Sequence, residues 1–581
     1  MQSVPNMQDY SKEYKEFTLP VPDRFSFPLD VFDKWGERLA LFWTDGIIEK
    51  KFSFSALKKL SSKGAGAFKK MGLNKGDKVI VLLPNIPEWW EIMLALMRIN
   101  AIPIPATTLL TSKDIEYRLT ATDIKAIITI DEETEKVEEA VNGSGTNPIL
   151  ILIYEHLSTL PSIPSHQGRG KLEETLMQQE TSLRSPLPSW ERVRVRGENS
   201  WHNYIKERDK ADAFEGDRAA SDEPALIYFT SGTTGPPKMV LHTQASYPLA
   251  HIITGRYWLD LRPGDIHWNL SDTGWAKAAW SSFFGPWHMG ATIFSLFKKG
   301  KFSPSLIIET LKRYPITTLC GPPTAYRMMV KEIQDSKFEF KSLRHFVAAG
   351  EPLNKDIIET WKERTGMYIY DGYGQTETVN VLANYRCLPV KPGSMGVPAP
   401  GFNVDIIDEN GKPVLPNTEG DIAIAVKPGR PAGLFKEYFG NPDATEMAVR
   451  GNWYMTEDRA YKDEEGYFWF VGRADDVILT SGYRIGPFEI ESVLIEHPAV
   501  KESAVVASPD EVRGEVVKAF VVLTQNYKPS DALAEELQEF VKGRTAPYKY
   551  PRKIEFVDDL PKTISGKIKR KELKMKEFGR I

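Results

Sequence analysis

Strand and helix patterns alternate along the chain from residue 78. Residues 78–83 show an apolar strand pattern, and bulky apolar side chains recur with a period near 3.6 in the segment that follows, as an amphipathic helix requires. The predicted elements are, in order, strand, helix, strand, helix and strand over residues 78–83, 88–99, 101–105, 112–119 and 124–130. This order predicts a parallel sheet covered by helices.

The same rhythm returns further along the chain. Apolar runs predict strands at residues 225–229, 265–270, 316–320 and 345–348. The large N-terminal part, residues 1–474, is therefore predicted to be α/β.

The pattern changes beyond residue 475. Strands are predicted at residues 500–507, 516–523 and 553–556, and Ser530 is predicted to cap a helix with one apolar face. Residues 475–581 fit a small second α/β domain. Small and polar residues at 472–476 offer a hinge between the two parts.

Residues 155–200 interrupt the alternation. The segment is rich in Ser, Pro, Arg and Gln, which suits a solvated loop and not a core strand. We interpret it as a disordered insertion without a catalytic role.

Length and composition narrow the class of protein. A chain of 581 residues is too long for one core, and a net charge of -4 makes nucleic acid an unlikely partner. Cys320 and Cys387 lie too far apart for a metal-ligand spacing. The first residues lack a signal-peptide core and no run of about 18 apolar residues predicts a membrane span, so we expect a cytoplasmic enzyme with a small-molecule substrate.

Hydroxyls, glycines and one lysine are concentrated after the strand at 225–229. Such a composition suits polyphosphate, because glycine lets backbone N–H groups face an anion and lysine adds a mobile charge. The spacing is not that of a Walker A loop, and a glycine-rich turn between two strands is the alternative. The loop comprises Thr230, Ser231, Gly232, Thr233, Thr234, Gly235, Pro236, Pro237 and Lys238.

Five further clusters follow this loop in the chain. They are SDTGWAK at 271–277, GEPLN at 350–354, DGYGQTET at 371–378, TEDRAYKDEEGYFWFVGRADD at 456–476 and PKTISGKIKR at 561–570. Together, in this order, the six motifs resemble the adenylate-forming superfamily of acyl-CoA synthetases, luciferases and peptide-synthetase adenylation domains. GYGQTET, FWFVGRADDVI, SGYRIGPFE and APYKYPR are most similar to the medium-chain acyl-CoA synthetases.

The resemblance covers nearly the whole chain apart from the insertion. It implies a large N-terminal AMP-binding domain, a small mobile C-terminal domain and two half-reactions. A carboxylate and ATP would give acyl-AMP and pyrophosphate, and coenzyme A would then form the thioester. ATP, Mg²⁺ and coenzyme A are the implied cofactors and a carboxylic acid is the implied substrate, while the oligomeric state stays open.

The resemblance also implies roles in phosphate binding. The 230–238 loop would hold the β- and γ-phosphates, Thr376 would contact the α-phosphate and Glu377 would help to hold Mg²⁺. Neutralising charge around the phosphates is what this reaction requires, and Mg²⁺ prefers carboxylate and phosphate oxygens. On their own, Thr376 and Glu377 would also fit a helix-capping pair.

The implied adenosine contacts come from several motifs. Tyr373 is expected to lie flat against adenine, and Asp458 and Arg473 to bind the ribose, although these two also fit a structural salt bridge. The family's Thr-Gly-Asp reads Thr456-Glu457-Asp458 here, which places a charged residue where glycine is common. The other implied contacts are Gly350, Glu351, Pro352, Asp371, Gly372, Gly374, Gln375 and Arg484.

Residues of the small domain complete the implied site. Lys567 matches the lysine that bridges the α-phosphate and the attacking carboxylate, and Asp475 matches the hinge about which the domains alternate. The implied coenzyme A contacts are Ser481, Gly482, Tyr483, Arg513, Tyr548, Lys549 and Tyr550.

The acyl pocket is expected beside Trp275, Ala276 and Lys277. Acetate-specific relatives carry tryptophan at the position of Gly374, so glycine there predicts a void for a medium-chain, branched or cyclic acid. Lys277 could pair with the substrate, the coenzyme or a nearby acid.

Two alternatives to an acyl-CoA synthetase stay open. An adenylation domain could pass its acyl group to a carrier protein, although no carrier domain follows Ile581. A degenerate adenylate-binding protein would not need Lys567, Glu377 and Asp458 together.

Overall fold

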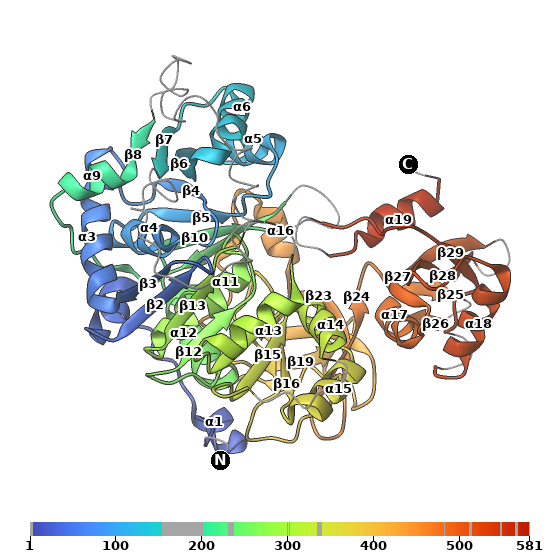
Figure 1. Cartoon of the computed structure of the whole chain (residues 1–581). Coiled ribbons are helices and arrows are strands. Elements are labelled where there is room, and N and C mark those ends of the chain that lie inside the picture. Colours follow the sequence, from blue (N-terminus) through green and yellow to red (C-terminus); the bar gives the residue numbers. More distant parts are fainter. Residues whose placement is uncertain are drawn as a thin grey trace, which may run out of the picture.

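The computed structural model describes residues 4–153, 201–230, 237–298, 300, 302–333, 340–480, 483–510, 514–545, 549–563 and 567–579. The predicted insertion, residues 155–200, lies outside these ranges. Within them the chain forms a large N-terminal α/β part and a small C-terminal α/β part, as predicted (Figure 1).

A five-stranded parallel sheet contains the first predicted elements. Its strand order is β5-β4-β6-β7-β8, and every neighbouring pair is parallel. Helices α4 and α5 are the crossovers, because parallel neighbours need a long connection. The elements are β4 (Lys78–Leu82), α4 (Pro87–Arg98), β5 (Ile102–Ala106), α5 (Ser112–Ala121), β6 (Ile124–Ile130), β7 (Ile149–Ile153) and β8 (His202–Asn203).

A nine-stranded sheet forms the centre of the large part. Its order is β18-β17-β16-β15-β14-β12-β13-β2-β3, and the six strands from β16 to β2 are parallel. The strands are β2 (Leu39–Thr44), β3 (Glu49–Ser53), β12 (Ile266–Asn269), β13 (Thr292–Leu296), β14 (Thr318–Gly321), β15 (His345–Ala349), β16 (Ile369–Tyr373), β17 (Leu382–Ala383) and β18 (Val397–Pro398). Helices α11 (Ala276–Ser281), α13 (Pro304–Arg313), α14 (Pro323–Glu332) and α15 (Lys355–Thr365) connect several of them.

The strand predicted at 225–229 does not belong to a parallel sheet. It is β10 (Pro224–Phe229), and it pairs antiparallel with β11 (Met239–Thr243), which in turn pairs with β21 (Glu437–Tyr438). The physical reason is the short loop at 230–238, which can close a hairpin but cannot cross over to a parallel neighbour.

An antiparallel sheet leads toward the small part. The order is β19-β20-β23-β22, with β24 on β23, and β24 ends at the predicted hinge. The strands are β19 (Val404–Ile407), β20 (Gly420–Ala425), β22 (Val449–Arg450), β23 (Trp453–Lys462) and β24 (Phe468–Arg473).

The small part packs its helices on the sheet β27-β28-β29, beside the hairpin β25-β26. Ser530 caps α18 as predicted, because its hydroxyl accepts the Leu533 N–H at 3.2 Å. The elements are β25 (Ile478–Thr480), β26 (Tyr483–Ile485), α17 (Pro487–Glu496), β27 (Val500–Asp510), β28 (Gly514–Leu523), α18 (Asp531–Lys542), β29 (Lys553–Phe556) and α19 (Arg570–Glu577).

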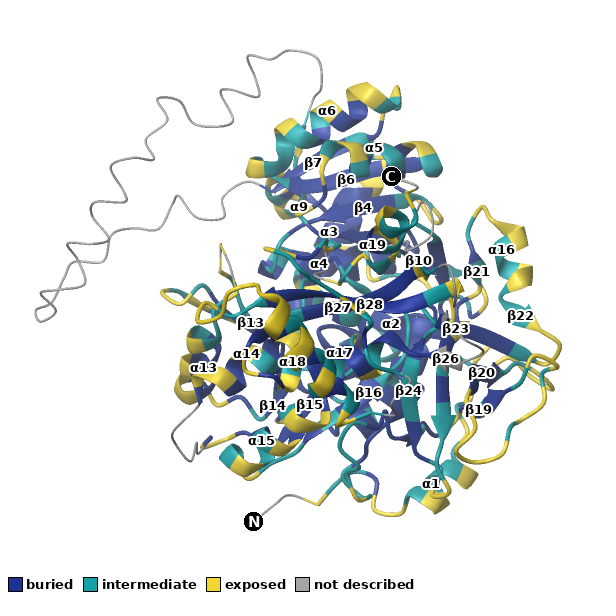
Figure 2. Ribbon diagram, turned by 90° about the vertical axis from the view of Figure 1, so that its right-hand side faces the viewer, coloured by how far each residue is buried: buried dark blue, intermediate teal, exposed yellow. Residues whose placement is uncertain are grey.

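Burial follows these layers. Figure 2 shows dark blue strands inside the molecule and exposed yellow positions on the outer faces of α13 and α18. Among the helices in the ranges given above, none has the length and apolarity needed to cross a membrane.

Candidate active site

Three predicted motifs leave the nine-stranded sheet at one edge. Residues 271–277 follow β12, residues 350–354 follow β15 and residues 371–378 span the end of β16. Because these strands are parallel, their carboxyl ends lie on the same side, where open α/β sheets bind ligands. The topology therefore brings together segments that are about 100 residues apart in the sequence.

The predicted phosphate loop is the turn of the β10–β11 hairpin. Residues 231–236 lie outside the described ranges, but the Thr230 N–H donates to the Lys238 carbonyl at 3.0 Å, and the Lys238 N–H donates to Thr230 Oγ1 at 3.2 Å. Pro237 precedes Lys238, whose ammonium lies 4.7 Å from the Tyr438 ring centroid. The two ends of the loop, Thr230 and Lys238, are therefore paired as in a turn between two antiparallel strands.

Glu377 is buried on the turn after β16. Its Oε1 accepts a hydrogen bond from the Tyr438 hydroxyl at 2.9 Å. Burial raises the pKa of Glu377, while the Tyr438 hydrogen bond and the charges of Lys238 and Arg473 lower it. A cation beside this carboxylate would offset its desolvation.

The surroundings of Glu377 fit Mg²⁺. In the part of the chain that the structure describes, no cluster of three or more His, Cys, Asp or Glu side chains could hold a metal by itself. Mg²⁺ is usually held by one or two carboxylates together with water and substrate phosphates, so a single carboxylate beside a phosphate loop suits it.

A carboxylate, an aromatic ring and an amide meet between β16 and β23. The Tyr373 hydroxyl donates to Asp458 Oδ2 at 2.6 Å, and Gln375 Nε2 donates to the same oxygen at 2.8 Å. Asp458 Oδ1 lies 3.9 Å from Arg473 Nε on the neighbouring strand. Burial raises the pKa of Asp458, and the Arg473 charge lowers it.

Glu457 has the left-handed backbone that glycine favours, with φ +62°. Its exposed carboxylate lies 3.0 Å from Arg473 Nη2 and 3.6 Å from Lys238 Nζ. The departure from the family pattern therefore places a carboxylate between two cations of the candidate site.

The segment after β15 turns sharply beside the site. Gly350 has φ +100°, a conformation that requires glycine. Glu351 accepts hydrogen bonds from Thr324 Oγ1 at 2.7 Å and Arg327 Nη2 at 3.2 Å, and Pro352 follows it. Asp371, in the middle of β16, has its pKa raised by burial.

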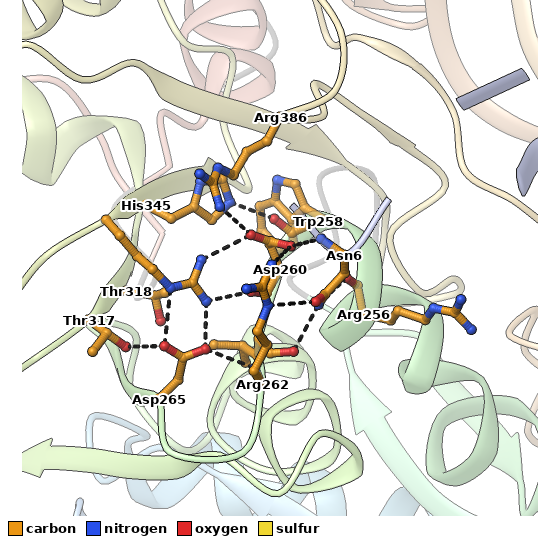
Figure 3. Close-up of polar contacts among 12 residues, drawn as sticks. Asn6, Arg256, Trp258, Asp260, Arg262, Asp265, Thr317, Thr318, His345 and Arg386 are labelled. Atoms are coloured by element: carbon orange, nitrogen blue, oxygen red, sulfur yellow. Dashed lines mark hydrogen bonds and ion pairs between the residues drawn. The ribbon is translucent and has the colours of Figure 1, made fainter. Parts of the chain in front are cut away.

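An ion-pair network supports the start of β15 (Figure 3). Buried Asp260 lies 2.9 Å from Arg344 Nη1 and 2.6 Å from Arg386 Nη1. Arg344 also pairs with Asp265 at 2.5 Å, and the Asn6 N–H donates to Asp260 at 2.6 Å. The network ties the N-terminal segment to the residue that precedes β15.

Trp258 lies beside this network, next to His345 (Figure 3), and also contacts β16. Its carbonyl lies 2.8 Å from His345 Nε2 on β15, and its indole N–H donates to the Tyr370 carbonyl on β16 at 3.2 Å. A Cβ on Gly372 would lie 2.5 Å from the indole. Glycine at 372 therefore lets Trp258 pack under the end of β16.

Lys567, the lysine predicted to be catalytic, acts electrostatically on two groups of the large part. Burial lowers the pKa of Lys277, and the positive charge of Lys567 lowers it further. The Lys567 charge also lowers the pKa of Asp458. Lys277 itself donates to the Ala349 carbonyl at 2.5 Å, so in this arrangement it contacts the end of β15.

The void predicted in front of Gly374 is absent. A Cβ at that position would lie 2.5 Å from Trp280 Cη2 and 2.5 Å from the Val379 carbonyl oxygen. Trp280, on α11, fills the space, and it is buried with 4% exposure. Trp275 and Ala276, at the start of the same helix, are half-buried.

Most of the predicted coenzyme A contacts lie outside the residues that the structure describes. Lys549 pairs with Glu489 at 2.6 Å, and the Tyr550 hydroxyl accepts from Arg552 Nη1 at 2.7 Å, both within the small part. Ser481, Gly482, Arg513 and Tyr548 lie outside the described residues, as do the side chains of Tyr483 and Arg484. Asp475, at the predicted hinge, lies 3.7 Å from Arg473 Nε.

Sequence reasoning missed several residues beside the site. His242 and Tyr247 donate to the Thr376 carbonyl at 2.8 and 2.6 Å. Trp280 was detectable as a second tryptophan close to Trp275, but a bulky residue on a helix is usually a core residue.

Comparison with known proteins agrees with this architecture. The model of the AMP-binding enzyme family matches residues 30–439, and that of the AMP-binding enzyme C-terminal domain matches residues 489–567. Acyl-coenzyme A synthetase ACSM3 of Rattus norvegicus is 46% identical, over 99% of this chain and 94% of its own. ACSM5 of Homo sapiens is 44% identical, over 96% and 92%.

Two solved structures are similar over nearly their full length. An acyl-CoA synthetase of Brucella canis has a TM-score of 0.70 and 31% identity, over 99% of this chain and 100% of that one. The anthranilate CoA ligase AuaEII, in complex with anthranoyl-AMP, has a TM-score of 0.80 and 26% identity, over 96% and 98%.

The fold defines an enzyme of the α/β class with a large AMP-binding domain and a small C-terminal domain. This chain belongs to the AMP-binding enzyme family. The predictions of an acyl-CoA synthetase and of ATP, Mg²⁺ and coenzyme A are confirmed by these relatives. The prediction of a cytoplasmic location is wrong, because relatives of 44–47% identity are named as mitochondrial.

Proposed function

We propose that this acyl-CoA synthetase activates a medium-chain, branched or cyclic acid in preference to acetate, with Lys567 as the residue that completes the first half-reaction. One observation carries the proposal. Tyr373 and Gln375 of the β16 motif hydrogen-bond to the buried Asp458 at 2.6 and 2.8 Å, and the charge of Lys567 from the small domain lowers the pKa of this carboxyl group. Adenylation needs a mobile lysine close to Asp458, which is expected to bind the ribose, and close to the segment expected to bind the carboxylic acid.

The first half-reaction requires control of negative charge. Lys238 and the N–H groups of its loop hold the β- and γ-phosphates, Thr376 contacts the α-phosphate, and Asp458 with Arg473 orients the ribose. When bound, Mg²⁺ at Glu377 neutralises phosphate charge. Lys567 aligns the substrate carboxylate with the α-phosphorus, and pyrophosphate leaves.

The acid size is set by Trp280 in this proposal. Trp280 takes the place of the void expected at Gly374, so the acyl chain lies against its indole and near Trp275. Truncating Trp280 to alanine is expected to lower the KM for bulkier acids, at about 0.8 kcal/mol for each additional buried methylene.

The second half-reaction follows rotation about Asp475. Lys567 withdraws, and the segment at 481–483 faces coenzyme A, whose thiol attacks the acyl-adenylate and releases AMP. The effect of Lys567 on the pKa values of Asp458 and Lys277 is consistent with the domain arrangement of the first half-reaction.

The test is acid-dependent pyrophosphate release with and without coenzyme A, across acids from acetate to medium-chain and cyclic acids. Lys567→Ala is expected to lose adenylation and to keep thiolysis of supplied acyl-adenylate. Lys569→Ala is the matched control, because Lys569 is an exposed lysine of the same segment that pairs with Glu572. Highest efficiency with acetate, or equal loss of both half-reactions in Lys567→Ala, would contradict the proposal.

A further inference from the structure

The carbonyl of Thr376 is held by two buried side chains. His242 Nε2 lies 2.8 Å and the Tyr247 hydroxyl 2.6 Å from this oxygen. A carbonyl oxygen has two lone pairs, so both are used. The peptide plane between Thr376 and Glu377 is therefore fixed at the turn that we assign to the α-phosphate and Mg²⁺.

The chemistry of His242 determines the direction of its hydrogen bonds. A carbonyl only accepts, so Nε2 carries the proton and Nδ1 faces the Ser246 hydroxyl at 3.0 Å. Burial lowers the pKa of His242 to about 3, which keeps the ring neutral. The Tyr247 ring stacks on this imidazole with centroids 3.5 Å apart.

Tyr247 has a second hydrogen bond that points to the acid site. The Trp280 indole N–H donates to the Tyr247 hydroxyl at 3.2 Å. This hydroxyl therefore accepts from Trp280 and donates to Thr376. It is the link between the indole in front of Gly374 and the phosphate turn.

Local backbone structure supports a role for this position. Tyr247 lies in a π-helical turn, residues Ala245–Leu249. Such turns are rare and frequently occur at functional sites. The wider helical turn carries Tyr247 toward both β16 and α11.

We propose that Tyr247 is a positioning residue that couples the acid site to the phosphate turn through the path Trp280 Nε1–H, Tyr247 hydroxyl and Thr376 carbonyl. An acid that shifts the indole changes the hydrogen bond that orients Thr376. Correct acid binding thereby aligns the turn for adenylation. The proposal rests on the assignment of Trp280 and Thr376 under the proposed function.

Tyr247→Phe tests the coupling, because it removes one oxygen and keeps the ring. It leaves the Trp280 N–H without its acceptor and Thr376 with one donor. We expect kcat for pyrophosphate release to fall about tenfold, and the ratio of kcat/KM between a short and a longer acid to change at least about threefold.

Tyr228→Phe is the matched control. Tyr228 is also buried, its ring centroid lies 6.1 Å from that of Tyr247, and its hydroxyl has no hydrogen-bond partner among the residues that the structure describes. Both kcat and the ratio between the acids are expected to stay within about twofold of the wild type. Thermal unfolding of each variant shows whether the fold is retained.

A double-mutant cycle of Tyr247 and Trp280 distinguishes coupling from a purely structural role, because a structural role would not make the two substitutions interact in the ratio between the acids. Trp280→Phe also removes the indole N–H, so Tyr247→Phe is expected to change the ratio between the acids much less in the Trp280→Phe background than in the wild-type enzyme. Additive changes, or an equal loss of kcat/KM for all acids in Tyr247→Phe, would overturn the coupling and leave the proposed function standing. No pyrophosphate release from the wild-type enzyme with any acid would overturn both.

Discussion

At the scale of single residues, an unfavourable backbone conformation occurs in the candidate site. Glu457 has φ +62°, and its carboxylate lies near Arg473 and Lys238. A left-handed conformation costs about 1–2 kcal/mol for a residue with a side chain. Strain of this kind tends to occur at functional sites, where the surrounding structure maintains it.

Glu457→Gly is expected to raise the free energy of unfolding by about 1 kcal/mol, because relief of strain exceeds the loss of two exposed ion pairs. The KM for ATP should fall about two- to threefold, since Arg473 and Lys238 no longer face a competing carboxylate. Urea unfolding and pyrophosphate release measure the two effects.

Two controls separate strain from charge at position 457. Glu457→Gln removes the charge and keeps the strain, so only the KM should fall. Asn417→Gly relieves a similar backbone, φ +63°, in an exposed turn, and only the stability should change. An unchanged KM in both Glu457 variants would show that its carboxylate does not compete with ATP.

At the scale of elements, the positions of strands and helices were largely predictable and their partners less so. Periodicity marked β4 to β6 and also their parallel pairing, since the helical crossovers were visible in the sequence. β10 was located correctly, but its partner depends on the loop length and on the distant β21.

The candidate site shows the same limit. The motifs predict roles for Asp458, Glu377 and Lys567, because each lies within a distinctive segment. The void at Gly374 was wrong, because α11 brings Trp280 to the glycine and sequence spacing does not specify that contact. His242 and Tyr247 were missed for the same reason, since buried polar partners are defined only by the fold.

A buried carboxylate on α4, that of Glu91, makes the stability of the protein depend on pH. Glu91 accepts from the Tyr204 hydroxyl at 2.7 Å and from Arg208 Nη1 at 3.1 Å. Burial raises the pKa of Glu91 to about 7, although Arg208 lowers it. The folded state therefore binds this proton more tightly than the unfolded chain, and the stability gained below about pH 4.5 is lost as the pH rises through about 7.

Glu91→Gln should remove this dependence. Relative to the variant, wild-type stability is expected to fall by about 3 kcal/mol between about pH 4.5 and about pH 8, at 1.36 kcal/mol for each unit of pKa. Urea unfolding across this range measures the difference. Glu139→Gln, at an exposed position on helix α6 (Thr134–Ser144), is the control, and its free energy of unfolding should vary with pH as that of the wild type does. The same pH dependence in Glu91→Gln and the wild type would contradict the prediction.

At the scale of the whole molecule, the reaction depends on where the small domain places Lys567. The N–H of Lys567 donates to Thr563 Oγ1 at 3.1 Å, which closes a hairpin just before α19. Arg570 begins α19 and pairs with Glu491 on α17 at 2.5 Å, and its Nη1 lies 3.9 Å from Asp476 next to the hinge. The Arg570 guanidinium thus connects the hairpin that carries Lys567 with Glu491 in the small domain and with Asp476 next to the hinge.

Arg570→Gln is expected to lower the rate of adenylation at least about tenfold and to affect thiolysis of supplied acyl-adenylate much less, because only the first half-reaction needs Lys567 in place. Removing one partner of a buried pair also costs about 3–5 kcal/mol of stability, so the rates must be measured where the variant is folded. Arg570→Lys keeps the charge and loses the bidentate contact, which should give an intermediate adenylation rate. If Arg570→Gln slowed both half-reactions equally, Arg570 would stabilise the small domain without positioning Lys567.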